Sequence, residues 1–69
     1  MFNTTEFKAQ MVRKKLSGRD VAKALGINEA TFYRKLRNDG SFTRGEIDTL
    51  IQVMEIANPS DIFFATKLA

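Results

Sequence analysis

Two short apolar runs on either side of Gly26 constrain the fold of this chain more than any other feature. They lie within residues 17–37 and repeat apolar side chains at helical spacing. Glycine can adopt the left-handed conformation at a helix end without strain, so Gly26 can end the first run. Ser17 and Asn28 precede the two runs, and both residue types favour the N-cap position. The stretch therefore predicts two short helices joined by a tight turn.

Capping signals place three further helices outside this stretch. Thr43 and Glu46 have the spacing of a capping box. Pro59 suits the first position of a last helix, and the polar residues 3–5 offer caps for an initial one. We therefore expect a single all-α domain over residues 1–69, a compact five-helix bundle with helices at about 5–15, 18–25, 29–37, 44–55 and 60–65.

Apolar spacing also predicts which helix faces are buried. The expected core faces comprise Phe7, Met11, Val12, Leu16, Val21, Leu25, Ile27, Ala30, Phe32, Leu36, Ile47, Leu50, Ile51 and Met54. Ala22 and Gly26 are small enough to let two helices approach closely across a short turn. Phe63 and Phe64 are adjacent, so one is expected to close the core and the other to stay exposed.

Charge is distributed unevenly along the chain. Residues 8–44 contain ten basic and three acidic residues, whereas residues 45–69 contain one basic and four acidic residues. A basic front and a mildly acidic back indicate a polyanionic partner on one side. The alternative is a set of solvated basic helix faces. Lys14, Lys15 and Lys23 in particular fit solvated surface as well as phosphate contact.

Composition argues against several classes of function. The chain has no cysteine and no histidine, which removes disulfides and the usual zinc sites and leaves no catalytic pair or metal spacing. No apolar run approaches the roughly 20 residues of a membrane span, and the N-terminus does not resemble a signal peptide. We expect a soluble, intracellular protein that is not an enzyme and needs no cofactor, metal or small-molecule ligand.

The sequence VAKALGIN at residues 21–28 resembles the V/L-A-x-x-L-G-V/I-S/N signature of the phage repressor and Cro family of helix-turn-helix proteins. Phe32 stands where that family places an apolar residue after the turn glycine. Residues 41–47 and 62–64 resemble small phage-encoded members, and the resemblance covers about residues 5–65. It implies a repressor-like helix-turn-helix fold in a phage or prophage transcriptional regulator. Such a protein binds an operator in double-stranded DNA, in the cytoplasm of a bacterial host.

The resemblance also implies which residues contact DNA. In this family the second helix of the motif enters the major groove, which makes the base-contact candidates Asn28, Glu29, Ala30, Tyr33 and Arg34. Arg34 is the strongest candidate for guanine, because its guanidinium can donate to two acceptors on one base edge. The phosphate-contact candidates are Ser17, Arg19, Lys35, Arg37, Asn38, Ser41, Thr43 and Arg44.

Three points remain open in the sequence. Many family members place glutamine at the first turn of the first motif helix, where this chain has Gly18, and Ser17 or Arg19 can take over the phosphate anchor. Tyr33 fits either a DNA contact or a half-packed side chain at the helix edge. The region of Phe63 and Phe64 can form a homodimer contact. The rival functions are a protein-interaction module, such as an anti-repressor or adaptor that retains the fold, and a non-specific architectural DNA binder.

Overall fold

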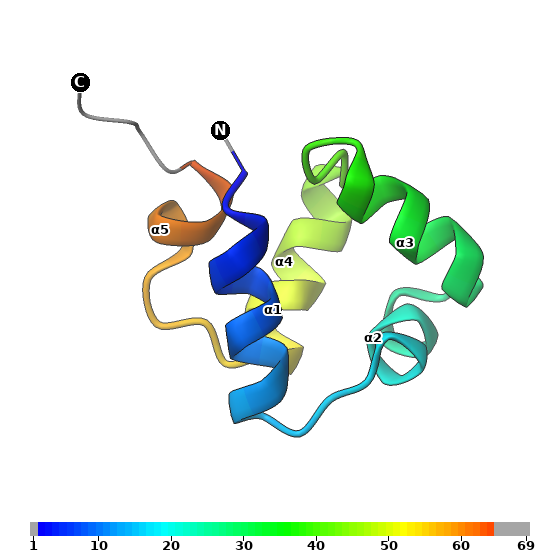
Figure 1. Cartoon of the computed structure of the whole chain (residues 1–69), viewed down its shortest axis with the longest axis horizontal. Coiled ribbons are helices and arrows are strands. Elements are labelled where there is room, and N and C mark those ends of the chain that lie inside the picture. Colours follow the sequence, from blue (N-terminus) through cyan, green and yellow to red (C-terminus); the bar gives the residue numbers. More distant parts are fainter. Residues whose placement is uncertain (1, 65–69) are drawn as a thin grey trace.

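The structure is a computed structural model that describes residues 2–64, and these form five helices with no strand among them (Figure 1). The all-α prediction is therefore confirmed. The predicted end of the last helix at residue 65 lies outside the described residues. The helices are α1 (Thr4–Arg13), α2 (Gly18–Leu25), α3 (Glu29–Arg37), α4 (Arg44–Val53) and α5 (Pro59–Phe63).

Helix starts are set by local side-chain caps. The side chains of Asn3, Ser17, Asn28 and Thr43 each accept a hydrogen bond from the backbone N–H three residues further along. Such a bond satisfies one of the backbone donors that a helix start leaves without a partner. Pro59 occupies the first turn of α5, where its missing N–H costs nothing. The starts of α2, α3 and α4 fall at the predicted residues, and those of α1 and α5 fall one residue earlier.

The ends of α1 and α4 lie two residues before the predicted positions, at Arg13 and Val53. Lys15 and Glu55 adopt left-handed backbone conformations, with φ of 56° and 50°. The N–H of the following residue then donates back across the helix end: Leu16 to Met11 O at 2.9 Å, and Ile56 to Ile51 O at 3.0 Å. The left-handed residue at such a helix end is usually glycine. Lysine and glutamate there leave no signal in the sequence.

Five of the six phenylalanines meet in the centre of the fold. Phe7 is fully buried, and its ring centroid lies between 5.4 and 6.4 Å from those of the other four members, Phe2, Phe32, Phe42 and Phe63. We call this group the phenylalanine centre. It joins α1, α3, α5 and both ends of the described chain in one apolar cluster. Phe63 is thus the core residue of the adjacent pair, while Phe64 is 63% exposed.

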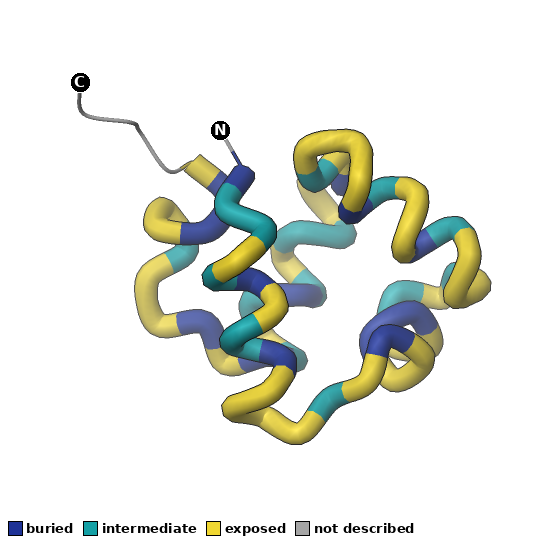
Figure 2. Tube along the Cα trace, in the orientation of Figure 1, coloured by how far each residue is buried: buried dark blue, intermediate teal, exposed yellow. Residues whose placement is uncertain are grey.

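Two predicted core residues lie on the surface instead. Val12 is 76% exposed, because it lies about 100° around α1 from the buried Met11. Ala30 is exposed because it lies on the opposite side of α3 from Phe32 and Leu36. The burial pattern is visible along the chain in Figure 2. Ala30 therefore belongs with the outward residues of α3.

The most extensive contacts between helices determine where α3 lies in the molecule. α3 packs on α2, α2 packs on α4, and α1 packs on α5. In Figure 1 the first of these pairs occupies one side of the molecule, while α1 and α5 occupy the other. The Gln10 side chain donates to the carbonyl oxygen of Met54 at 2.7 Å and ties α1 to the end of α4. This arrangement leaves the outer side of α3 free.

Candidate nucleic-acid interface

Backbone geometry at Gly26 closes the turn between α2 and α3. Gly26 has a φ of 73°, and the N–H of Ile27 donates to the carbonyl oxygen of Ala22 at 3.1 Å. The Asn28 side chain then accepts from the N–H of Thr31 at 2.7 Å and begins α3. A Cβ at Gly26 would meet no atom within 4 Å. Glycine is therefore needed for its conformation and not for close helix contact; of the two small residues expected at the contact, only Ala22 is buried.

The outward face of α3 is polar and basic. All five residues predicted to contact bases are exposed, namely Asn28, Glu29, Ala30, Tyr33 and Arg34. Arg37 is exposed as well, one turn further along the helix. Phe32 and Leu36, which are buried, anchor the opposite side. The helix therefore has one face that is free of core packing, which a helix needs if its side chains are to reach base edges.

Four of the five arginines form no ion pair within residues 2–64, and they lie on α2, α3 and the start of α4: Arg19, Arg34, Arg37 and Arg44. The fifth, Arg13 on α1, has its Nη1 2.8 Å from Glu6 Oε1. Lys14 pairs with Glu55 at 3.4 Å. Acidic side chains thus neutralise part of the basic charge around α1, while the α2–α3 side keeps its arginines for an external anion.

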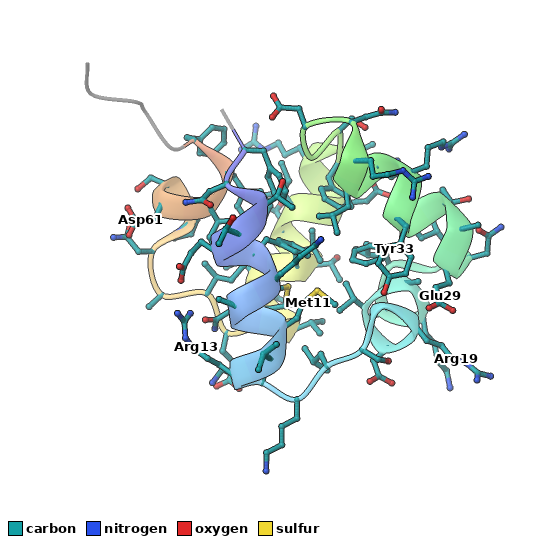
Figure 3. All side chains as sticks on the ribbon, in the orientation of Figure 1. Met11, Arg13, Arg19, Glu29, Tyr33 and Asp61 are labelled. Atoms are coloured by element: carbon teal, nitrogen blue, oxygen red, sulfur yellow. The ribbon has the colours of Figure 1, made fainter. Side chains whose placement is uncertain are left out.

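The Tyr33 side chain combines the two predicted possibilities, a half-packed ring and a side chain exposed for contact with DNA. Its ring meets the buried Phe32 ring edge-on at 5.2 Å, and the residue is 36% exposed. Figure 3 shows the side chain directed from α3 toward α2. At α2 the ring lies against Gly18, which is buried. Tyr33 is therefore packed on one side and open on the other.

The Ser17 hydroxyl is used to begin α2. It accepts from the N–H of Asp20 at 3.1 Å and donates to Asp20 Oδ2 at 2.9 Å, while the Ser17 N–H donates to the same carboxylate oxygen at 2.9 Å. The backbone hydrogen bond from Ser17, followed by the bond from its side chain, lowers the pKa of the Asp20 carboxyl. Arg19, the other candidate for the phosphate anchor, is exposed, and its side chain points outward from α2 (Figure 3).

Lys35 and Thr43 tie α3 to the start of α4. The Glu46 carboxylate Oε1 accepts from the Thr43 N–H at 2.8 Å and from Lys35 Nζ at 3.0 Å, and both charged side chains are largely buried. Burial raises the pKa of the Glu46 carboxyl, but the hydrogen bonds from Thr43 and Lys35 outweigh it and lower the pKa overall. The Thr43 hydroxyl accepts from the Glu46 N–H at 3.1 Å. Among the phosphate-contact candidates, Lys35 therefore also has a structural role.

The loop between α3 and α4 carries the remaining candidates. Asn38 and Ser41 are exposed, as is Arg44 at the start of α4. Asp39 and Gly40 have positive φ values of 57° and 66°, which reverse the chain between the two helices. This reversal brings Ser41 next to the end of α3, where its N–H donates to the carbonyl oxygen of Lys35 at 3.1 Å.

Sequence reasoning missed two pairings that shape this surface, Gly18 with Tyr33 and Lys35 with Glu46. Both join residues more than ten positions apart in different helices, so neither follows from spacing along one helix. No signal in the sequence marks the first pair. A glycine stands in the first turn of both α2 and α4, and only Gly18 has another side chain in the space that its Cβ would occupy.

No protein-family model, curated protein or solved structure matches this chain. Within residues 2–64, none of the helices is long and apolar enough to cross a membrane. The same residues contain no cluster of three or more acidic side chains placed to hold a metal ion. Geometry and charge are therefore the grounds on which a function is proposed.

Proposed function

We propose that this chain is a sequence-specific DNA-binding transcriptional regulator of the helix-turn-helix class, similar to phage repressors and Cro proteins. α2 and α3 form the motif, and α3 enters the major groove of an operator. The observation that carries the proposal is the outward face of α3, where Arg34 and Arg37 are exposed and form no ion pair within residues 2–64. Exposed arginine side chains on a helix face that takes no part in core packing can donate hydrogen bonds to base edges.

The surrounding residues support a phosphate-binding rim. Arg19 lies in the first turn of α2 and Arg44 in the first turn of α4, on either side of α3 in the chain. Contacts of this kind set the register of a protein on the duplex, while base contacts supply the specificity. We propose a homodimer on a two-fold site, formed through the C-terminal helix and the region of Phe63 and Phe64. No cofactor is part of the proposal.

Selection of bound sites from random DNA, followed by titration at two salt concentrations, tests this function. A regulator should prefer the selected site strongly over random DNA and should show a steep loss of affinity with salt. A palindromic site would support the dimer. Equal affinity for all sequences would indicate an architectural binder. Absence of binding at low salt would leave the protein-interaction module, in which the α3 face contacts another protein.

Substitution of Arg34 by alanine sharpens the test. Binding to the selected site should weaken by about 1–3 kcal/mol, with relaxed discrimination at one base pair. Arg13→Ala is the matched control, because Arg13 lies on α1 and pairs with Glu6. A uniform loss on every sequence would show that Arg34 contacts phosphate only.

A further inference from the structure

Tyr33 and Gly18 fit together as a large and a small residue. A Cβ at Gly18 would overlap the tyrosine ring, lying 2.8 Å from Cε2 and closer still to the hydroxyl. Gly18 is the first residue of α2, and its φ is not in the left-handed region. Glycine is therefore not required there by the backbone. The space that a side chain would fill is occupied by Tyr33.

The opposing contacts hold the ring in one place. Phe32 meets it edge-on from α3, and Gly18 meets its far end from α2. An apolar groove of ≈ 400 Å³ lies beside it, lined among others by Met11, Val12 and Leu16. A larger residue at position 18 would displace the ring from its place against α2. The atoms that must move are the end of a side chain, so the backbone can stay in place.

The hydroxyl at the end of the ring has no hydrogen-bond partner within residues 2–64. The ring brings it to the first turn of α2, where the Ser17 hydroxyl is already used in the capping box with Asp20. In a helix-turn-helix complex the first motif helix crosses the DNA backbone, and phosphate oxygens accept hydrogen bonds from tyrosine. A donor without a partner therefore lies where a phosphate is expected.

We infer that Tyr33 contacts a DNA phosphate at the start of α2 and does not read a base, and that Gly18 is the positioning residue that makes room for it. This inference rests on the proposed function. The phosphate contact expected from the first motif helix then comes from a side chain of the second helix. Gly18 and Tyr33 then act as one unit, so that a change at either removes the same DNA contact.

The tyrosine itself reports on the contact without DNA. Tyr33 is the only tyrosine, and the chain has no tryptophan, so the intrinsic emission belongs to this one ring. In Gly18→Ala the displaced ring should become more accessible to quenching by acrylamide. Gly45→Ala adds the same methyl group to the first turn of α4, where nothing lies within 4 Å, and should leave quenching unchanged. Equal quenching of all three proteins would overturn the contact.

DNA titration tests the phosphate assignment. Tyr33→Phe keeps the ring and removes only the hydroxyl, so affinity should fall by about tenfold on selected and random DNA alike, as expected for a hydrogen bond to a charged group. Gly18→Ala should weaken binding similarly, and it should add little in the Tyr33→Phe background. A loss confined to the selected site would make Tyr33 a base reader, and no loss would remove it from the interface.

The two arms separate the possible failures. If the wild-type protein binds no DNA, the proposed function and the phosphate assignment fall together. A difference in quenching would then show that the Gly18–Tyr33 contact serves packing alone. If Gly18→Ala does not fold, as judged by circular dichroism, Tyr33→Phe still decides the phosphate assignment, because that variant retains the ring contacts with Phe32 and Gly18.

Discussion

The phenylalanine centre and the α2–turn–α3 unit, residues 17–37, stabilise one small protein by different means. The centre gathers rings from both ends of the described chain around Phe7, with no hydrogen bond between them. The unit is closed by bonds between residues three to five positions apart, such as those at Ser17, Ile27 and Asn28. Burial of the rings stabilises the fold but does not fix where a helix begins. Capping bonds fix the start of a helix but contribute little free energy.

Phe32 is the residue that the two regions share. The centroid of its buried ring lies 6.1 Å from that of Phe7. The ring also contacts that of Tyr33, which is on the exposed side of α3. The outward face of α3 therefore takes its position from the centre and its local shape from the turn. This division predicts that substitutions in the centre unfold the protein, while substitutions in the unit alter its surface at a smaller cost in stability.

The largest effect is expected at Phe7. Replacement by alanine removes a fully buried ring that contacts four others, and it should cost about 3–5 kcal/mol of unfolding free energy. A domain of this size has little stability to spare, so most of its cooperative transition should be lost. Urea denaturation followed by circular dichroism measures the change. Val12→Ala is the control, because Val12 is exposed, and it should change stability by less than about 0.5 kcal/mol.

A small loss of stability in Phe7→Ala would contradict the proposed difference between the phenylalanine centre and the α2–turn–α3 unit. It would mean that neighbouring rings close the cavity, and that the unit supplies more of the stability than its hydrogen bonds suggest. A large effect at Val12 would instead show that the surface of α1 is covered in solution.

The same contrast explains what could be predicted from the sequence. Caps act within one turn, so Ser17, Asn28 and Thr43 could be assigned as helix starts from residue type alone. The ends of α1 and α4, at Arg13 and Val53, could not, because the left-handed conformations of Lys15 and Glu55 bring the next residue, Leu16 or Ile56, onto the core. That requirement depends on the packed structure and leaves no local mark.

The candidate site divides in the same way. The exposed face of α3 followed from helical periodicity, since residues three and four apart share a face. The contact of Tyr33 with Gly18 and the bond of Lys35 to Glu46 depend on how separate helices pack. The spacing of residues along the chain does not show which side chains of different helices lie close together. The sequence therefore left Tyr33 as either a DNA contact or a half-packed residue, and it predicted only a phosphate contact for Lys35.

An intermediate effect is expected at Gly26. Its φ of 73° is unfavourable for any residue with a Cβ, and nothing lies within 4 Å to be disturbed. Gly26→Ala should therefore cost about 1 kcal/mol from the backbone alone. Gly45→Ala, at a helical position with open space, should be neutral or slightly stabilising. Equal unfolding free energies for the two variants would show that the turn tolerates another conformation.

The smallest effect should appear in the pH dependence of stability, which depends on the carboxylates of the two capping boxes and not on the phenylalanine centre. The pKa values of the Asp20 and Glu46 carboxyls are lowered in the folded protein. Each ionised carboxylate therefore stabilises the fold above its unfolded pKa of about 4, and this contribution is lost as the pH falls through the lower folded value. Unfolding free energy should thus decrease on acidification.

The variant with both Asp20→Asn and Glu46→Gln isolates this contribution. Its stability should be lower than that of the wild type at neutral pH and should fall less steeply in acid, because amides do not titrate in this range. Val12→Ala in the same buffers is the control and should follow the wild-type curve. Parallel acid curves for the wild type and the double variant would mean that the capping boxes add no pH-dependent stability.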